Sequence, residues 1–277
     1  MDGRLRLAGI AAAAAIVGCR VPPPDLSRDP AELLRAVRAA QGRVQRVEGS
    51  AKVHLQSPQG SGWVDEFLAA ERPDRVRLET RDFFGNVASV LVADGGRFAL
   101  YDARGKVYYR GEASAENVSR LLPLALPPAD LVDLLCGTAP LLAGEPRQVA
   151  VRDSLLVLRL AGGPGEQELS VGEEAAVEAS RVRWASPSPG RPDQDLELWA
   201  FRRRGGVRFP TAARLVAPAA GVSLELRWKE DLEVNGPSDP ALFRLDPPRG
   251  ARVVELLPGT VAPPLELPTR PGPPPRE

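Results

Sequence analysis

The sequence has few of the residues on which catalytic and crosslinked proteins depend. It contains two cysteines and one histidine, and its 36 Lys and Arg residues balance 36 Asp and Glu residues. The balanced charge lacks the basic excess that nucleic-acid-binding proteins use, so we expect no nucleic-acid partner. The one histidine, His54, has no cysteine or paired carboxylate close to it in the sequence, which argues against a metal site or a catalytic triad. We also find no nucleophile elbow and no glycine-rich phosphate loop, and we therefore expect neither an enzyme nor a cofactor.

The apolar run near the N-terminus is too short to cross a bilayer. It covers residues 7–17, well under the roughly 20 residues that a transmembrane helix requires. Two arginines precede it and a small residue follows it, as in an export signal with a cleavage site. Residues 16–19, Ile-Val-Gly-Cys, resemble the lipobox of bacterial lipoproteins. We therefore expect residues 1–18 to be a signal peptide and Cys19 to be the lipidated first residue of the mature protein. The alternative is an ordinary signal peptide with an incidental cysteine.

Proline-rich segments flank the central part of the sequence. Residues 19–28 include three consecutive prolines and predict a stiff tether that reaches at most ~3.3 Å per residue, so the domain would stay within about 30 Å of the bilayer. Arg20 stands where an aspartate would resemble an inner-membrane retention signal, which favours the outer membrane. Residues 258–277 contain many prolines, which neither donate to a sheet nor continue a helix, and predict a solvated tail. A polyproline segment that binds a partner is the alternative.

The pattern of residues 29–257 predicts one β-rich domain with three helices. Asp29 and Glu32 indicate the capped start of a helix, and apolar residues continue at helical spacing as far as Val47. Helical patterns at 114–122 and 127–137 interrupt the strands, with Ser114 as a cap and Gly137 as a stop. Alternating residues between turn signals predict an antiparallel meander. The first alternating segment starts at residue 48. The strands predicted after it are 63–67, 75–80, 87–93, 97–101, 106–110, 148–152, 155–160, 166–171, 177–184, 196–201, 210–216 and 222–232.

Two features indicate how this domain is stabilised. Residues 87–93 and 155–158 are apolar at consecutive positions, so both faces of the sheet must be covered there. Cys136 has no partner for an intrachain disulfide if Cys19 is acylated. Stability must then come from the apolar core.

The order of elements resembles the LolA/LolB lipoprotein-carrier superfamily. The local pieces of the resemblance are residues 121–124 with 130–137, and the ending at 228–235 with 243–253. The resemblance implies a mostly β fold with a few helices, a half-open antiparallel β-barrel with a helical lid over an apolar cavity that holds the acyl chains of lipoproteins in transit. Lipidated Cys19 places the chain nearer the LolB-type acceptor, which implies an outer-membrane lipoprotein that faces the periplasm and meets a periplasmic carrier protein. The proline-rich tail departs from the family pattern.

Several residues are candidates for the site that this resemblance implies. Only 5% of the residues are aromatic, which suits an aliphatic cavity better than one that stacks a flat ligand. The tryptophans are either cavity lining or core. The candidates for the cavity lining are Leu91, Leu158, Trp184, Trp199 and Trp228.

Two surface segments are candidates for contact with the membrane. Phe83 and Phe84 lie between two predicted strands, where LolB-like proteins carry a protruding apolar loop. Adjacent side chains on a strand point to opposite faces, so one of the two phenylalanines is exposed unless the loop folds back and buries both. Arg202, Arg203 and Arg204 form a predicted hairpin tip that either meets anionic headgroups or is simply solvated.

The sequence therefore favours a membrane-anchored lipoprotein that binds acyl chains and receives or inserts lipoproteins at the outer membrane. The alternative is an envelope lipoprotein on the same fold that transports nothing and acts as a structural or protein-interaction module.

Overall fold

The computed structural model describes residues 22–257, except residues 59, 83, 120–125 and 188–190. The predicted signal peptide, Cys19, Phe83 and the proline-rich tail lie outside the described residues. Within the described residues, no helix combines the length and apolar character that a membrane span needs.

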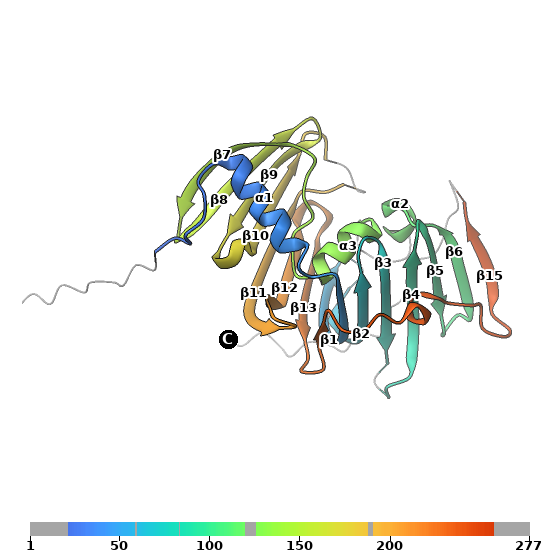
Figure 1. The fold of residues 1–277 in the computed structure, drawn as a ribbon. Coiled ribbons are helices and arrows are strands. Elements are labelled where there is room, and N and C mark those ends of the chain that lie inside the picture. The colour runs from blue at the N-terminus through green and yellow to red at the C-terminus, as the bar shows by residue number, and fades with distance from the viewer. Residues whose placement is uncertain (1–21, 59, 83, 120–125, 188–190, 258–277) are drawn as a thin grey trace, which may run out of the picture.

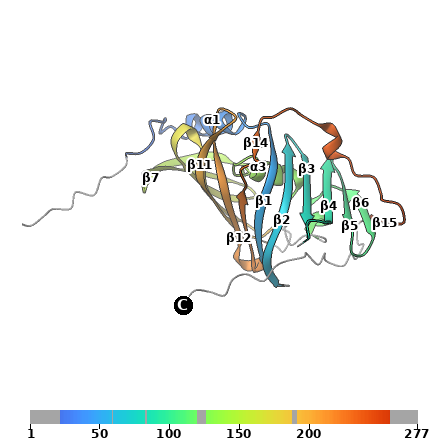
Figure 2. The same cartoon turned by 90° about the horizontal axis from the view of Figure 1, so that it is seen from below.

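One large, curved sheet organises the molecule (Figures 1 and 2). In the described part of the chain, its 15 strands follow the order β15-β6-β5-β4-β3-β2-β1-β13-β12-β11-β10-β9-β8-β7, with β14 beside β1. Neighbouring strands are antiparallel, except that β15 runs parallel to β6. The sheet stays open because β15 and β7 are the two ends of this order. The strands are β1 Arg46–Ser57, β2 Gly60–Glu71, β3 Arg75–Arg81, β4 Val87–Asp94, β5 Arg97–Asp102, β6 Val107–Glu112, β7 Glu145–Arg152, β8 Leu155–Gly162, β9 Gly165–Val171, β10 Val177–Trp184, β11 Gln194–Arg204, β12 Val207–Ala217, β13 Val222–Trp228, β14 Glu233–Val234 and β15 Arg252–Leu256.

Among the residues that the structure describes, three α-helices accompany the sheet: α1 Pro30–Gln41, α2 Ala115–Ser119 and α3 Pro128–Leu135. Asp29 caps α1 as predicted, because its carboxylate accepts a hydrogen bond from the backbone N–H of Glu32 at 2.8 Å. The side chain of Glu32 reaches the backbone N–H of Asp29 only through Ser27. The Glu32 carboxylate accepts from the Ser27 hydroxyl at 2.7 Å, and that hydroxyl accepts from the Asp29 N–H at 3.1 Å.

The predicted extension of α1 to Val47 is wrong. The helix ends at Gln41, and the N–H of Gly42 bonds to the carbonyl of Arg38. Glycine is a poor helix former, and the alternating pattern that begins at Arg46 continues as β1. Val44 and Val47 are buried in the main core instead of on a helix.

The helices divide the concave side of the sheet into two apolar clusters. In the first, Val132 and Leu135 of α3 pack among residues of β1 to β6 and β13. In the second, Leu33 of α1 packs with Leu158 of β8 and with Leu134 of α3. The helix α3 therefore contributes to both clusters, and Figure 2 shows the sheet curving around it.

The convex side of β4 is covered as well. Val90 and Val92 form a third cluster with Phe243, which belongs to the 3₁₀-helix η3, Pro240–Phe243. Leu91, the intervening residue, faces the main core on the concave side. This arrangement confirms that an apolar run such as 87–93 requires cover on both faces. The other short 3₁₀-helices are η1 Glu173–Ala175 and η2 Pro218–Ala220.

Candidate functional site

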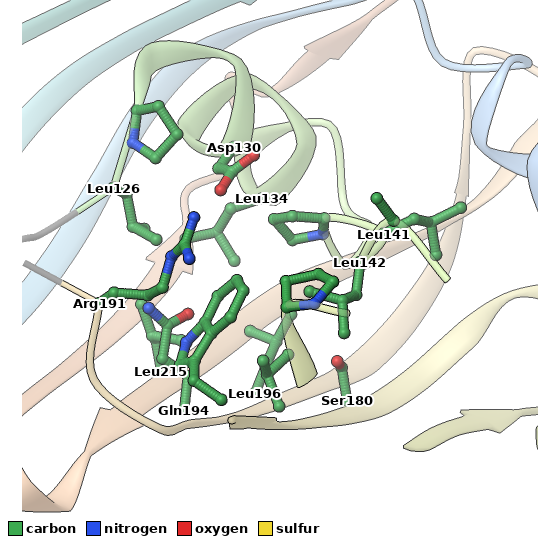
Figure 3. A pocket seen from close by; sticks show the side chains of 16 residues that line it. Leu126, Asp130, Leu134, Leu141, Leu142, Ser180, Arg191, Gln194, Leu196 and Leu215 are labelled. Carbon is green, nitrogen blue, oxygen red and sulfur yellow. The ribbon is translucent and has the colours of Figure 1, made fainter. Parts of the chain in front are cut away.

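A cavity of about 400 Å³ lies between α3 and strands β10 to β12. Asp130 and Leu134 reach into it from α3, while Ser180, Leu196 and Leu215 face them from the sheet (Figure 3). Its volume falls within the range of about 300–1,000 Å³ that is typical of small-molecule sites. The lining residues are Leu126, Pro127, Asp130, Leu134, Pro140, Leu141, Leu142, Ala143, Pro164, Ser180, Val182, Trp184, Arg191, Gln194, Leu196 and Leu215.

Few of these residues bring charge to the cavity. The guanidinium of Arg191 lies 4.5 Å from the centre of the Trp184 ring, and the indole N–H of Trp184 donates to the carbonyl of Pro192 at 2.9 Å. Burial, with a smaller contribution from Asp133, raises the pKa of Asp130 to about 6. The described lining of the cavity is thus mostly aliphatic, with one aromatic wall, one cation and one weak acid.

A buried glutamine holds one wall of this cavity in place. Gln167 lies on β9 and is fully buried. Its amide nitrogen donates to the carbonyl of Pro140 at 2.8 Å and to the hydroxyl of Ser180 at 2.9 Å, and its amide oxygen accepts from the N–H of Leu142 at 2.8 Å. One side chain therefore attaches the segment 140–142 to the sheet.

A second, smaller hollow of about 80 Å³ lies beneath α3 on the other half of the sheet. Leu134 lines both hollows. The helix α3 is therefore the partition between them, and moving it would join the two spaces. The lining of the second hollow consists of Val53, Leu55, Val64, Glu66, Leu68, Leu78, Thr80, Ser89, Leu91, Leu100, Leu131, Leu134, Leu135, Leu224 and Leu226.

Polar contacts hold α3 at one edge. Asp133 forms an ion pair with Arg72, whose Nε also donates to the carbonyl of Val44 at 2.8 Å. Burial raises the pKa of Asp133, and the hydrogen bond from Arg72 opposes that rise. At the end of the helix, Gly137 has φ of +74°, and a Cβ there would lie 2.8 Å from Cδ of Pro210. Glycine is needed at this stop for both reasons.

The structure places the predicted lining residues in different environments. Trp184 lines the larger cavity and Leu91 lines the smaller one. Leu158 is fully buried in the second cluster, under α1. Trp228 packs at the border of the main core, and Trp199 follows the inward-facing Leu198, so it points to the convex face. Leu158, Trp199 and Trp228 line neither hollow.

The two surface candidates differ in their surroundings. Phe84 is 83% exposed, in a turn where the Asp82 carboxylate accepts from the N–H groups of Phe84 and Asn86 at 2.8 Å. In the arginine run, Arg203 forms an ion pair with Glu174, and Arg204 forms one with Glu230. That pairing favours a solvated surface over a basic membrane patch.

The side chain of His54 on β1 contacts residues of the adjacent strand β2. Its Nε2 lies 3.1 Å from the Ser61 hydroxyl, and its ring lies 4.8 Å from that of Trp63. Across the described residues, no group of three or more His, Cys, Asp and Glu side chains is arranged to hold a metal ion.

Comparison of the sequence with models of known families finds no match, and comparison with curated proteins finds none. Solved structures do match the fold. A DUF1329 family protein from Desulfovibrio piger has a TM-score of 0.56 and 12% identity, and the match covers 79% of this chain and 98% of that one. A putative outer membrane lipoprotein-sorting protein domain from Vibrio parahaemolyticus has a TM-score of 0.54 and 12% identity, with 76% and 98% covered.

A third solved structure that matches the fold belongs to a LolA superfamily protein. A LolA superfamily protein from Nitrosomonas europaea has a TM-score of 0.53 and 10% identity, and the match covers 78% of this chain and 97% of that one. This chain has the LolA/LolB-like fold. The curved sheet corresponds to the half-open barrel of the LolA/LolB-like fold. The helix α3 covers its concave side, at the position predicted for the lid.

The residues that sequence reasoning missed on the concave side include Glu66, Asp130, Leu134 and Gln167. Leu134 belongs to the apolar stripe of the predicted helix at 127–137, which was a usable signal. Glu66 and Gln167 occupy inward positions between apolar residues on β2 and β9. A polar residue that interrupts an inward stripe was the signal for both.

Proposed function

We propose that the protein is a lipid-anchored envelope lipoprotein that binds acyl chains on the concave side of its sheet. It receives or inserts lipoproteins at the outer membrane, with its domain in the periplasm. The observation that supports this best is the pair of apolar hollows that share Leu134 as their partition. We expect no enzymatic activity and no cofactor.

Displacement of α3 has a physical basis in the contacts beneath it. Leu131, Leu134 and Leu135 line the smaller hollow and pack against the sheet. An acyl chain gains about 0.8 kcal/mol for each CH₂ group that it buries. Contacts between lipid and sheet would therefore replace the contacts between α3 and the sheet with a small net change in free energy. The protein would then interconvert between a state with α3 on the sheet and a state with a bound acyl chain.

The membrane contacts belong to the same proposal. Acylation of Cys19 supplies the anchor, and two or more acyl chains hold a protein stably on a bilayer. The exposed ring of Phe84 at the turn between β3 and β4 supports a role for this loop in contact with the bilayer. A periplasmic carrier protein that delivers the cargo is the expected partner.

Photocrosslinking tests the lipid site directly. The probe is a phosphatidylethanolamine that carries a diazirine in a palmitoyl chain, and crosslinked peptides of the full-length lipoprotein are mapped by mass spectrometry. We expect crosslinks at residues of the larger cavity. Val182→Trp fills that cavity from β10, and we expect it to reduce crosslinking by at least about tenfold, which corresponds to ~1.4 kcal/mol.

Val151→Trp is the matched control, because Val151 is 48% exposed on β7. Crosslinks spread over the outer surface, or equal losses in both variants, would contradict the proposal. Transport is tested separately by depleting the protein and measuring where other lipoproteins accumulate. An unchanged distribution would leave the alternative, a structural or interaction module.

A further inference from the structure

A row of three polar side chains crosses the floor of the smaller hollow. Glu66 on β2 pairs directly with Thr80 on β3, and Thr80 pairs with Ser89 on β4. All three line the hollow, and the other twelve described residues that line it are valine and leucine. Adjacent strands lie about 4.8 Å apart, so the three side chains form a continuous polar line in an aliphatic site.

The carboxyl group of Glu66 is only half satisfied. Its Oε1 accepts a hydrogen bond from the Thr80 hydroxyl at 2.7 Å. Its Oε2 is buried and has no hydrogen-bond partner among the described residues. A buried polar atom without a partner destabilises the protein, and a ligand that supplies the partner would recover that stability.

The surroundings of Glu66 favour its neutral form. Burial, more than the charges of Glu79 and Asp65, raises its pKa to about 7, although the Thr80 hydrogen bond lowers it. The nearby cations have other partners, because Arg77 pairs with Glu79 and Lys229 pairs with Asp65.

Among the described residues, the neighbouring elements add no cation to the lining of the hollow. On the adjacent strand β1, Ala51 lies directly opposite Glu66. The helix α3 contributes leucines to the hollow. Of its two carboxylates, Asp133 is paired with Arg72 and Asp130 lines the other cavity.

The hydrogen bond from Thr80 also determines which oxygen of Glu66 can donate. Because Oε1 accepts from Thr80, a proton on the carboxyl group resides on Oε2, where it is available to an acceptor in the hollow. The Ser89 hydroxyl, two strands away, adds a second group that both donates and accepts.

We propose that Glu66, Thr80 and Ser89 form a polar subsite that binds the carbonyl end of an ester- or amide-linked acyl chain. This inference rests on the proposed function and specifies its ligand. The carbonyl oxygen accepts a hydrogen bond from Oε2 of Glu66, and the hydrocarbon tail extends past Leu134 into the larger cavity. The subsite discriminates against a free fatty-acid anion, whose charge would meet an acidic group, and gives a plain alkane no polar contact.

Competition against the diazirine lipid tests the subsite. The full-length chain with Cys19→Ala is used, so that its own acyl chains do not compete. The competitors are methyl decanoate, decanoate and undecane at pH 7. We expect methyl decanoate to compete about tenfold better than undecane, which corresponds to the ~1.4 kcal/mol expected for one buried hydrogen bond.

Substitutions of Glu66 separate hydrogen bonding from packing. Glu66→Gln keeps a neutral donor, and we expect it to retain the preference for the ester and to admit decanoate more readily. Glu66→Leu removes the donor, and we expect this variant to bind methyl decanoate and undecane equally. Glu197→Leu, at an exposed position of β11, is the matched control. If Glu66→Leu fails to fold, Thr80→Val supplies the second test, because it removes the group that orients the carboxyl proton.

The outcomes separate the two proposals. Equal competition by ester and alkane in the protein with native Glu66 would overturn the subsite and leave the acyl-chain carrier intact. A preference for the ester that survives Glu66→Leu would do the same. If neither methyl decanoate nor undecane competes with the probe, the carrier proposal fails, and the subsite fails with it.

Discussion

Replacement of Gln167 by methionine should destabilise the protein by about 4 kcal/mol. Gln167 makes three hydrogen bonds, to Pro140, Leu142 and Ser180. A typical net hydrogen bond contributes about 0.5–1.5 kcal/mol, and a buried group left without its partner costs about 1–3 kcal/mol. Methionine has a similar length and no hydrogen-bonding amide, so the loss of hydrogen bonds dominates over any change in packing.

The effect should be local as well as global. Without Gln167, the segment 140–142 loses its attachment to β9, and this segment forms one wall of the larger cavity. We therefore expect the amide of Leu142 to exchange its hydrogen faster, and binding of the acyl probe to weaken. Urea denaturation measures the change in the free energy of unfolding. With a slope of about 3 kcal/mol per molar urea, the midpoint should fall by roughly 1 M.

Gln194→Met is the matched control. Gln194 lines the same cavity, but its side chain makes no hydrogen bond to another residue in the described part of the chain, so we expect a change within about 0.5 kcal/mol. The reasoning is refuted if Gln167→Met unfolds at the same urea concentration as the unaltered protein and the Leu142 amide stays equally protected.

Three further perturbations test other parts of the structure. Because the pKa of Glu66 is raised from 4.5 to about 7 in the folded protein, the folded state keeps a proton that the unfolded chain loses. Its contribution to stability is complete below pH 4.5 and falls as pH rises through 7, by about 3 kcal/mol in all; Glu66→Gln should remove this difference between pH 4.5 and pH 8 in urea titrations, and an equal slope in both proteins would contradict the burial argument. Burial raises the pKa of the Cys136 thiol to about 12, so with Cys19→Ala a thiol reagent at pH 8 should label the folded chain far more slowly than the unfolded one; equal rates would show that the thiol is accessible. Arg72→Ala should cost about 2 kcal/mol and speed amide exchange in α3, because it leaves Asp133 without its partner; Arg35→Ala, at an exposed pair, should change stability by under about 0.5 kcal/mol, and the same effect from both would refute a role for Arg72 in holding the helix.

Local signals in the sequence predicted most elements of this fold. Asp29 and Ser114 cap helices as predicted, and their side chains accept from backbone N–H groups three residues later. Where two patterns overlapped, the prediction failed, as at Val47, whose position fits both a helical stripe and the strand that forms. The predicted strand 222–232 likewise ends at Trp228, where the N–H of Leu232 bonds to the carbonyl of Lys229 in a turn.

Features that depend on distant segments could not be predicted in the same way. The parallel pairing of β15 with β6 depends on the path of residues 229–251 past several strands. Alternation shows which side chains share a face of the sheet, but it does not show which of them a helix covers. For this reason Leu91 and Leu158 were indistinguishable in sequence, although the first lines a hollow and the second lies under α1.

The placement of β15 also determines where the two ends of the described chain leave the molecule. The helix α1 contacts β7 and β8, whereas β15 pairs with β6 at the opposite end of the strand order. Measured along the curved sheet, the interval between these edges is about 60 Å. If the protein is anchored through Cys19 as proposed, a partner that binds at the β15 edge of the sheet need not compete for space with the bilayer.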